Sequence, residues 1–285
     1  MDVLDKEMST ETIVAGNESC EFIYRKGNEG QNSLPELTNN LDAVSLVFAN
    51  DLRKPTDVGE VRFHGGFSSG IAPIGPLYRV VRARHVRRIT SFTSRERGTD
   101  EVLSGDEIMS EIDDVIGFAV DLSDQRLYVG VTKKKNGHQL IESSHLSVDF
   151  FGTVIGHDEE RFHVYGPRLH AEDSFQFYYA ASAGALLTGE EVSHKFKLLK
   201  EKWESERVEF VGGFMFASKL RGRFYFTRTN FDSSPFLANF NQAPLAGVFC
   251  SGEIARGFSD TPFSNKFSAV YVGLSYSPPQ RPPLK

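Results

Sequence analysis

The chain has 285 residues, of which 40% are hydrophobic and 25% charged, and its formal net charge at pH 7 is −6. This composition is that of an ordinary globular protein and excludes a wholly disordered chain. The negative charge argues against a protein that coats nucleic acid through bulk electrostatics. The two cysteines, Cys20 and Cys250, are too few for a disulfide framework or a cysteine-rich zinc site.

The first segment, residues 1–41, is polar and has no sustained hydrophobic period, so we expect a flexible N-terminal extension. It has acidic residues where a secretory signal needs basic ones. No apolar run in the chain reaches the roughly 18 residues of a membrane-spanning helix. We therefore expect no membrane partner and a cytoplasmic or nuclear location.

The next segments have the composition of β-strands. Strands are expected at 45–49, 60–68 and 77–84, and the Gly- and Pro-rich stretch 70–76 predicts a rigid turn between the last two. The stretch 126–132 alternates apolar and other residues, which predicts a strand with one buried face.

Three later stretches are also strand-like. Phe175, Phe177 and Tyr179 alternate along 174–180, which places them on one face. The stretches 209–218 and 268–276 are apolar on both faces, which is typical of central strands.

Helix signals are fewer. A helix near 190–203 is predicted by an apolar stripe with spacings of four, three and four, formed by Val192, Phe196, Leu199 and Trp203. Ser104 is a candidate N-cap of a shorter helix, and Ser234, followed by Pro235, is a candidate N-cap of another. Many strands with few helices predict an α+β fold with a large mixed, mainly antiparallel sheet.

The densest basic stretch contains Arg79, Arg82, Arg84, Arg87 and Arg88. Arg82 and Arg84 point to one face of a strand and Arg87 to the other, which favours a solvated edge strand. A stripe that binds a partner or RNA is the alternative, and the acidic balance of the chain argues against nucleic acid.

No cofactor or metal is expected. The histidines at 145, 157, 163 and 170 match no zinc-binding spacing, and the chain has no P-loop or dinucleotide fingerprint.

The stretch "PLAGVFCSGEIARG", residues 244–257, allows several interpretations. Cys250 with Glu253 is either a nucleophile and its orienting acid or a small buried residue beside a polar one, because no histidine base is near in sequence. Its glycines admit positive φ, which predicts a sharp turn. That turn either binds an anion or a carboxylate, or only connects two strands.

At residues 208–254 the sequence resembles the C-terminal signature of the FIST domain, in which a hydrophobic strand leads to an Arg-Gly pair, a short helix and a "P-x-x-G-x-F-x-x-G-E-I" element. Arg221 and Gly222 match the pair. The later element is matched by Pro244, Gly247, Phe249, Gly252, Glu253 and Ile254. Where the family often has "C-x-G-R-G", this chain has Ser218 and Leu220.

The resemblance covers roughly residues 42–277, and residues 278–285 are expected to form a Pro-rich tail. Among FIST proteins, the sequence is most similar to those of plants that carry an F-box. The resemblance implies a FIST-C-like domain that acts as a sensory or recognition module, not as an enzyme, and binds a protein substrate or a small amino-acid-like ligand. An enzyme that uses Cys250 is the alternative. The implied binding residues are Arg221, Gly222, Gly247, Cys250, Gly252 and Glu253.

Two expectations follow from the resemblance. Arg221 and Gly222 should lie near Gly252 and Glu253, with Arg221 paired either with Glu253 or with a ligand carboxylate.

In residues 1–41, only the stretch "SLPELTNNL" is faintly similar to part of an F-box. We therefore expect this chain by itself to bind neither Skp nor cullin, and to have at most an indirect link to a Skp–cullin ubiquitin ligase.

Overall fold

The computed structural model describes residues 12–17, 23–24, 36–37, 48, 55, 57–117, 127–132, 148, 150–166, 168–256 and 264–279. The expected strand at 45–49, Cys20 and His145 lie outside the described residues. The helices are α2 (Gly105–Gly117), α3 (Ser182–Glu206), α4 (Arg223–Phe226) and α5 (Ser234–Leu237). With an extensive, mostly antiparallel set of strands, they confirm the α+β class.

Six strands, β5 to β10, form a closed antiparallel barrel. They are β5 (Ile71–Val86), β6 (Ile89–Glu96), β7 (Leu127–Thr132), β8 (Phe150–His157), β9 (Phe162–Tyr165) and β10 (Ser174–Ala180). Their order is β8-β7-β10-β5-β6-β9, and β9 pairs again with β8, so the sheet closes on itself. The interior is filled by large apolar side chains such as Tyr78, Phe92, Phe162, Phe175 and Phe177, against which α2 packs Ile108 and Ile112.

Helix α2 begins where the sequence predicts. The Glu107 backbone N–H donates to the Ser104 hydroxyl at 3.1 Å, and the Ser104 N–H donates to the Glu107 carboxylate at 2.8 Å. This reciprocal arrangement is a capping box and confirms Ser104 as an N-cap.

Two predictions about the barrel strands are wrong. Strand β7 is buried on both faces, because Tyr128 packs against Phe267 and Gly130 lies against Tyr178. The stretch 70–76 is not a turn: β5 runs through it with an irregularity in its pairing to β10 and with Gly75 at φ +69°. The glycine makes a bulge in a continuous strand.

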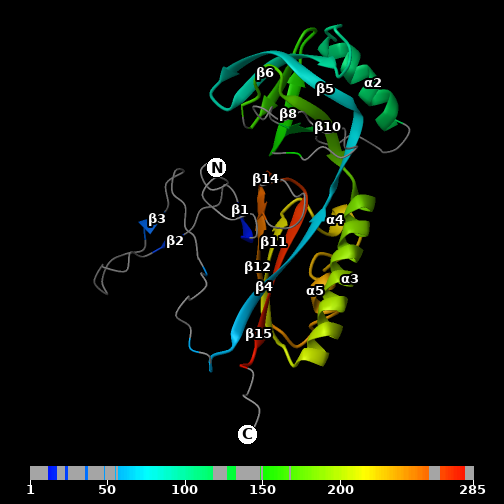
Figure 1. Cartoon of the computed structure of the whole chain (residues 1–285). Helices are drawn as coiled ribbons and strands as arrows, with labels where there is room; N and C mark the ends of the chain where they lie inside the picture. The colour runs from blue at the N-terminus through cyan, green and yellow to red at the C-terminus, as the bar shows by residue number, and fades with distance from the viewer. Residues whose placement is uncertain are drawn as a thin grey trace.

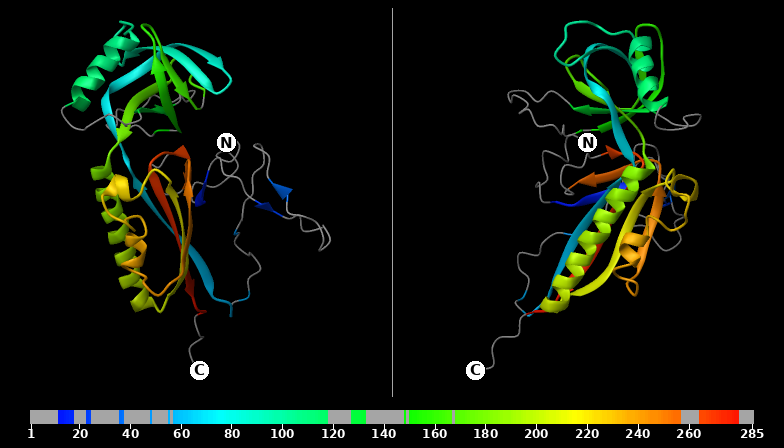
Figure 2. Two further views of the ribbon diagram at one scale, coloured as in Figure 1. Left: turned by 180° about the vertical axis from the view of Figure 1, so that it is seen from behind. Right: turned by 90° about the vertical axis from the view of Figure 1, so that its right-hand side faces the viewer.

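A second, four-stranded sheet has the order β12-β11-β15-β4. Its strands are β4 (Glu60–Ser69), β11 (Glu209–Ser218), β12 (Leu245–Cys250) and β15 (Ser268–Ser277). The two stretches with apolar residues on both faces are the two central strands, as predicted. Figures 1 and 2 show α3, α4 and α5 along one side of this sheet and the barrel at its end.

The predicted apolar stripe of α3 faces the sheet. Val192, Phe196 and Trp203 are buried against β-strand residues and the aromatic rings of Phe236 and Phe240, and Leu199 packs at the edge of this cluster. Helix α5 begins one residue away from the prediction: its N-cap is Ser233, and the Ser234 hydroxyl donates to the Phe231 carbonyl at 2.7 Å. Ser234 therefore does not cap the helix.

The other side of the four-stranded sheet carries β1 (Val14–Asn17) and β13 (Glu253–Arg256), which pair antiparallel. Ala255 and Ala15 pack there against Val270 and Val272. Part of the segment expected to be flexible, residues 14–17, is thus a strand, because β13 provides its hydrogen-bonding partner. Three two-residue strands complete the described structure: β2 (Ile23–Tyr24), β3 (Glu36–Leu37) and β14 (Ser264–Asn265).

The basic stretch forms a hairpin of β5 and β6. Arg87 and Arg88 lie in its turn, with Arg87 at φ +57°, so Arg87 is not on a strand face as the alternation predicts. Strand β10 pairs with β5 only as far as Arg79. After Arg79, β5 continues to pair with β6 on one side, and the expected edge is its other side. In the described part of the chain, no helix is both long enough and apolar enough to cross a membrane.

Candidate functional site at the junction of the two sheets

The chain passes from the four-stranded sheet to the barrel at Gly70, between β4 and β5. The Gly70 carbonyl accepts hydrogen bonds from the Tyr225 hydroxyl at 2.6 Å and from the Ala181 N–H at 2.8 Å. A Cβ at this position would lie 2.3 Å from the Phe267 carbonyl oxygen. Only glycine permits so close an approach.

Arg221 is 1% exposed and lies beside this junction. Its guanidinium donates to the Asp232 carboxylate from Nε at 3.0 Å and from one terminal nitrogen at 2.7 Å. The remaining donors reach the Ser68 carbonyl, the Ser68 hydroxyl and the Phe267 carbonyl at 2.9–3.0 Å. All five N–H donors of the side chain are thus used within the protein.

Glu253 is buried at the start of β13, with 0% exposure. One carboxylate oxygen accepts from the Ser268 hydroxyl at 2.8 Å and from the Ser268 N–H at 3.2 Å. The other oxygen has no hydrogen-bond partner among the described residues. Burial raises the pKa of Glu253 to about 7, and the Ser268 bonds, Lys266 and Arg221 partly offset this effect.

Asn17 lies opposite Glu253 in the β1–β13 pair. Directly opposite residues of antiparallel strands place their side chains on the same face. The Asn17 amide oxygen is also buried without a partner in the part of the chain that is described. Two buried acceptor oxygens thus lie on one face of this strand pair, and an N–H donor is the kind of group that each of them could bind when Glu253 is ionised.

The structure brings the two predicted motifs together through the start of β15. Arg221 donates to the carbonyl of Phe267, and the next residue, Ser268, donates to Glu253. The Lys219 N–H also donates to the Cys250 carbonyl at 2.8 Å. Arg221 pairs with Asp232 rather than with Glu253, so its position is fixed by internal contacts.

The predicted glycines have different roles. Gly247 allows β12 to approach β11, because a Cβ would lie 2.4 Å from the Met215 carbonyl oxygen. Gly222 precedes α4, and a Cβ there would meet no described atom within 4 Å. A bend at Ser251 and Gly252 leads from β12 to β13, as predicted, although neither Gly247 nor the buried Gly252 has positive φ, and Gly257 lies outside the described residues.

Cys250 ends β12 and is buried, with its thiol hydrogen directed to the Val248 carbonyl at 3.6 Å. A nucleophile must be reached by its substrate, and this side chain is enclosed by protein. Its surroundings correspond to the small buried residue of the two interpretations.

Sequence reasoning missed Asp232, Ser68, Ser268 and Asn17. Asp232 follows Arg221 by 11 residues on the opposite side of α4, so no local period connects the two. The rule that could have pointed to Asp232 is that a buried arginine needs a carboxylate partner.

The described residues contain no group of three or more potential metal ligands. The three described histidines among those weighed for a metal lie beside different carboxylates: His157 is 3.1 Å from Asp106, His163 is 3.2 Å from Asp158 and His170 is 3.8 Å from Asp173. They are therefore separate surface contacts.

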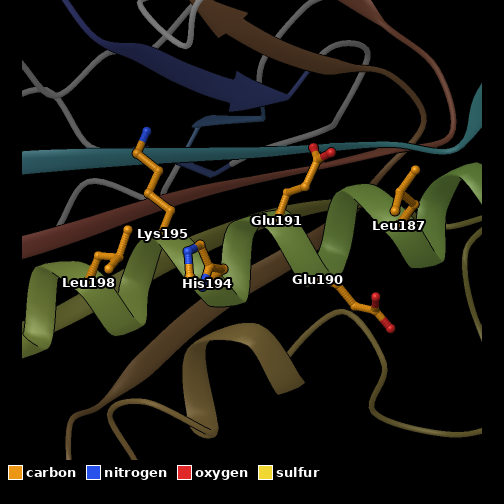
Figure 3. Close-up of a pocket in the computed structure, with 6 residues that line it drawn as sticks. All are labelled: Leu187, Glu190, Glu191, His194, Lys195 and Leu198. Atoms are coloured by element: carbon orange, nitrogen blue, oxygen red, sulfur yellow. The ribbon is translucent and has the colours of Figure 1, made fainter.

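A shallow surface pocket of about 420 Å³ lies along α3. Figure 3 shows its six lining side chains, Leu187, Glu190, Glu191, His194, Lys195 and Leu198, all from this one helix. The Lys195 ammonium group donates to the Gly65 carbonyl at 2.7 Å. Because no residue of a second element lines it, the pocket lacks the convergent polar groups of a ligand site.

No protein-family model matches the chain, and no solved structure matches it. The chain is similar to a plant protein, an F-box/LRR-repeat protein of Arabidopsis thaliana, with 31% identity over 291 residues. The match covers 96% of this chain but 54% of that protein, so the chain spans about half the length of its relative. The chain is thus distantly related to a plant F-box protein, and the FIST assignment stays a prediction.

Proposed function

We propose that residues 42–277 form a FIST-C-like recognition module that binds a small ligand or a protein substrate and has no catalytic role. Two observations support this proposal: the similarity to a plant F-box/LRR-repeat protein and the ordered FIST-like motifs at the junction. The name of the relative favours a role near ubiquitin-ligase substrate selection, in the cytoplasm or nucleus.

The main support for a ligand that bears an amino group is the carboxylate oxygen of Glu253 that has no hydrogen-bond partner among the described residues. A buried acceptor without a donor costs about 1–3 kcal/mol, and a bound ammonium group would recover this free energy. The Asn17 amide oxygen on the same face adds a second acceptor. The site therefore fits the amino group of a small amino-acid-like ligand.

Arg221, Gly222, Gly247, Cys250 and Gly252 support the site rather than contact the ligand. Arg221 fixes Phe267, which precedes the Ser268 that holds Glu253. Gly247 and Cys250 belong to β12, whose end leads directly to β13. Because Glu253 is enclosed, a ligand reaches it only when junction side chains move.

An enzyme that uses Cys250 is the second candidate, and its burial disfavours it. Cys250→Ser should leave ligand binding unchanged. Turnover that requires the Cys250 thiol would support the enzyme instead.

The test is a calorimetric and thermal-shift screen of amino acids and primary amines against the whole chain. We expect at least one amine to stabilise the wild type at pH 8 and to bind at least about tenfold more weakly to Glu253→Gln, since a charge-assisted bond is lost. Glu204→Gln on the exposed surface of α3 is the matched control and should bind like the wild type. Equal binding by the wild type and Glu253→Gln would contradict the proposed site.

A further inference from the structure

The hairpin of β5 and β6 extends past the end of β10, while β9 pairs with β6 as far as Ile89, beside the hairpin turn. The β5–β10 pairing ends at Arg79, whereas the β5–β6 pairing continues to Val86 and Ile89. Figure 1 shows this cyan hairpin projecting to the left of the barrel. Arg84, Val86 and Ile89 on its outer surface are exposed, so no described element covers them.

Apolar side chains form a row on this outer surface. Val86 is opposite Ile89 and Ile89 is opposite Tyr165, so the three side chains share one face across β5, β6 and β9. Ile155 of β8 lies at the irregularity between the Val154–Val164 and Gly156–His163 pairs, next to β9, and is exposed as well. We call Val86, Ile89, Tyr165 and Ile155 the arm patch; their exposures are 56%, 37%, 46% and 53%.

Arginines border the arm patch. Arg84 and Arg87 are exposed, and their side chains make no hydrogen bond or ion pair with any described residue. Arg88 donates to the Tyr165 hydroxyl at 3.3 Å. The acidic turn 158–161 adjoins the Phe162 end of β9, which pairs with Phe92, so it lies at the opposite end of β9 from Tyr165 and Ile89.

The charge of this region is positive although the chain is acidic overall. His85, on the same hairpin, has a lowered pKa, through burial and then through His170 and Arg168. Arginines on an edge strand deter aggregation. That role does not explain four exposed apolar side chains in one row beside them, whereas aromatic and arginine side chains together are typical of protein interfaces.

We propose that the arm patch is a docking surface for an acidic, apolar-containing protein segment. The apolar side chains of the partner pack on Val86, Ile89, Tyr165 and Ile155, and its carboxylates pair with Arg84, Arg87 and Arg88. The arm patch and its arginines include none of the residues around Gly70, Arg221 and Glu253. The proposal therefore does not depend on the Glu253 site.

The test uses the whole chain and a fluorescein-labelled peptide that alternates glutamate with valine and leucine. Fluorescence anisotropy should show saturable binding that weakens as salt is added. Arg84→Glu with Arg87→Glu should weaken binding at least about tenfold, because both attractions become repulsions. Val86→Ser with Ile155→Ser should weaken it by a similar factor.

Two matched controls separate this surface from others. Lys197→Glu with Lys200→Glu, on exposed positions of α3, and Glu253→Gln at the junction should each leave peptide affinity unchanged. A peptide of glutamate alone that binds equally well would overturn the role of the apolar row. Tighter binding of an RNA oligonucleotide through the same arginines, or no peptide binding at all, would overturn the proposal.

Discussion

Arg221 forms a buried ion pair with the carboxylate of Asp232. Both side chains are buried, and the remaining guanidinium donors reach Ser68 and Phe267. Removing one member of a buried pair leaves an uncompensated charge, which costs about 3–5 kcal/mol. We expect Asp232→Asn to lower the free energy of unfolding by about that amount in urea titrations.

Asp100 provides the control for this substitution, since its side chain is fully exposed and lies 3.3 Å from Arg95. Exposed pairs contribute about 0–1 kcal/mol, so Asp100→Asn should change stability little. Equal losses in the two variants would contradict a structural role for the Arg221–Asp232 pair.

Glu253 makes stability depend on pH. Burial raises its pKa to about 7, above the 4.5 of an ordinary glutamate, so the folded state holds a proton that the unfolded state has lost between these values. Stability is therefore greatest below pH 4.5 for this group and decreases as the pH rises to about 7. The loss is at most about 3 kcal/mol.

Glu253→Gln should remove this dependence, because glutamine does not titrate and keeps an oxygen for Ser268. We expect the variant to be more stable than the wild type at pH 8 and to differ less at pH 5, measured by urea unfolding at both values. Parallel stability–pH curves for the two proteins would show that Glu253 does not titrate in this range.

At the scale of single elements, the start of α2 depends on local chemistry. Ser104 accepts from the Glu107 N–H, and that backbone donor has no partner within the helix. Ser104→Ala should lower the free energy of unfolding by about 1 kcal/mol. Ser110→Ala, at an exposed position inside the same helix, should be neutral or slightly stabilising, and an equal effect of both changes would argue against the cap.

Strand β5 shows how an element depends on its neighbours. Its Gly75 and Pro76 have the composition of a turn, yet the strand continues because β10 pairs on both sides of the irregularity. The Gln176 side chain donates to the Gly75 carbonyl at 2.8 Å, which satisfies that backbone group. Turn propensity is a weak preference that pairing across a barrel overrides.

At the scale of the whole molecule, Gly70 joins the barrel to the four-stranded sheet. A Cβ there would lie 2.3 Å from the Phe267 oxygen, which already accepts from Arg221. Gly70→Ala should therefore cost about 3 kcal/mol of unfolding free energy through overpacking.

Gly16→Ala is the control, because a Cβ at this strand position meets no described atom within 4 Å. We expect thermal unfolding to show a clear loss of stability for Gly70→Ala and little change for Gly16→Ala. Wild-type stability in Gly70→Ala would mean that the junction relaxes freely around a methyl group.

The sequence alone determined the features that depend on neighbours along the chain. The stripe of Val192, Phe196 and Trp203 predicted α3, the apolar stretches 209–218 and 268–276 predicted the central strands, and Ser104 predicted a helix start. Each follows from a helix or strand period, or from a cap, that lies within a few residues. The FIST-like motifs also indicated which segments meet at the candidate site.

Only the tertiary structure decided the closure of the barrel, the partner of Arg221 and the surroundings of Glu253. Strand β9 closes the barrel by pairing with β8, Arg221 finds Asp232 beyond an intervening helix, and Ser268 reaches Glu253 from another strand. Hydrogen bonds and burial depend on distance in space, and no local pattern records which distant groups become neighbours. The charge of Glu253 is the sharpest case, since its ionisation depends on the protein that encloses it.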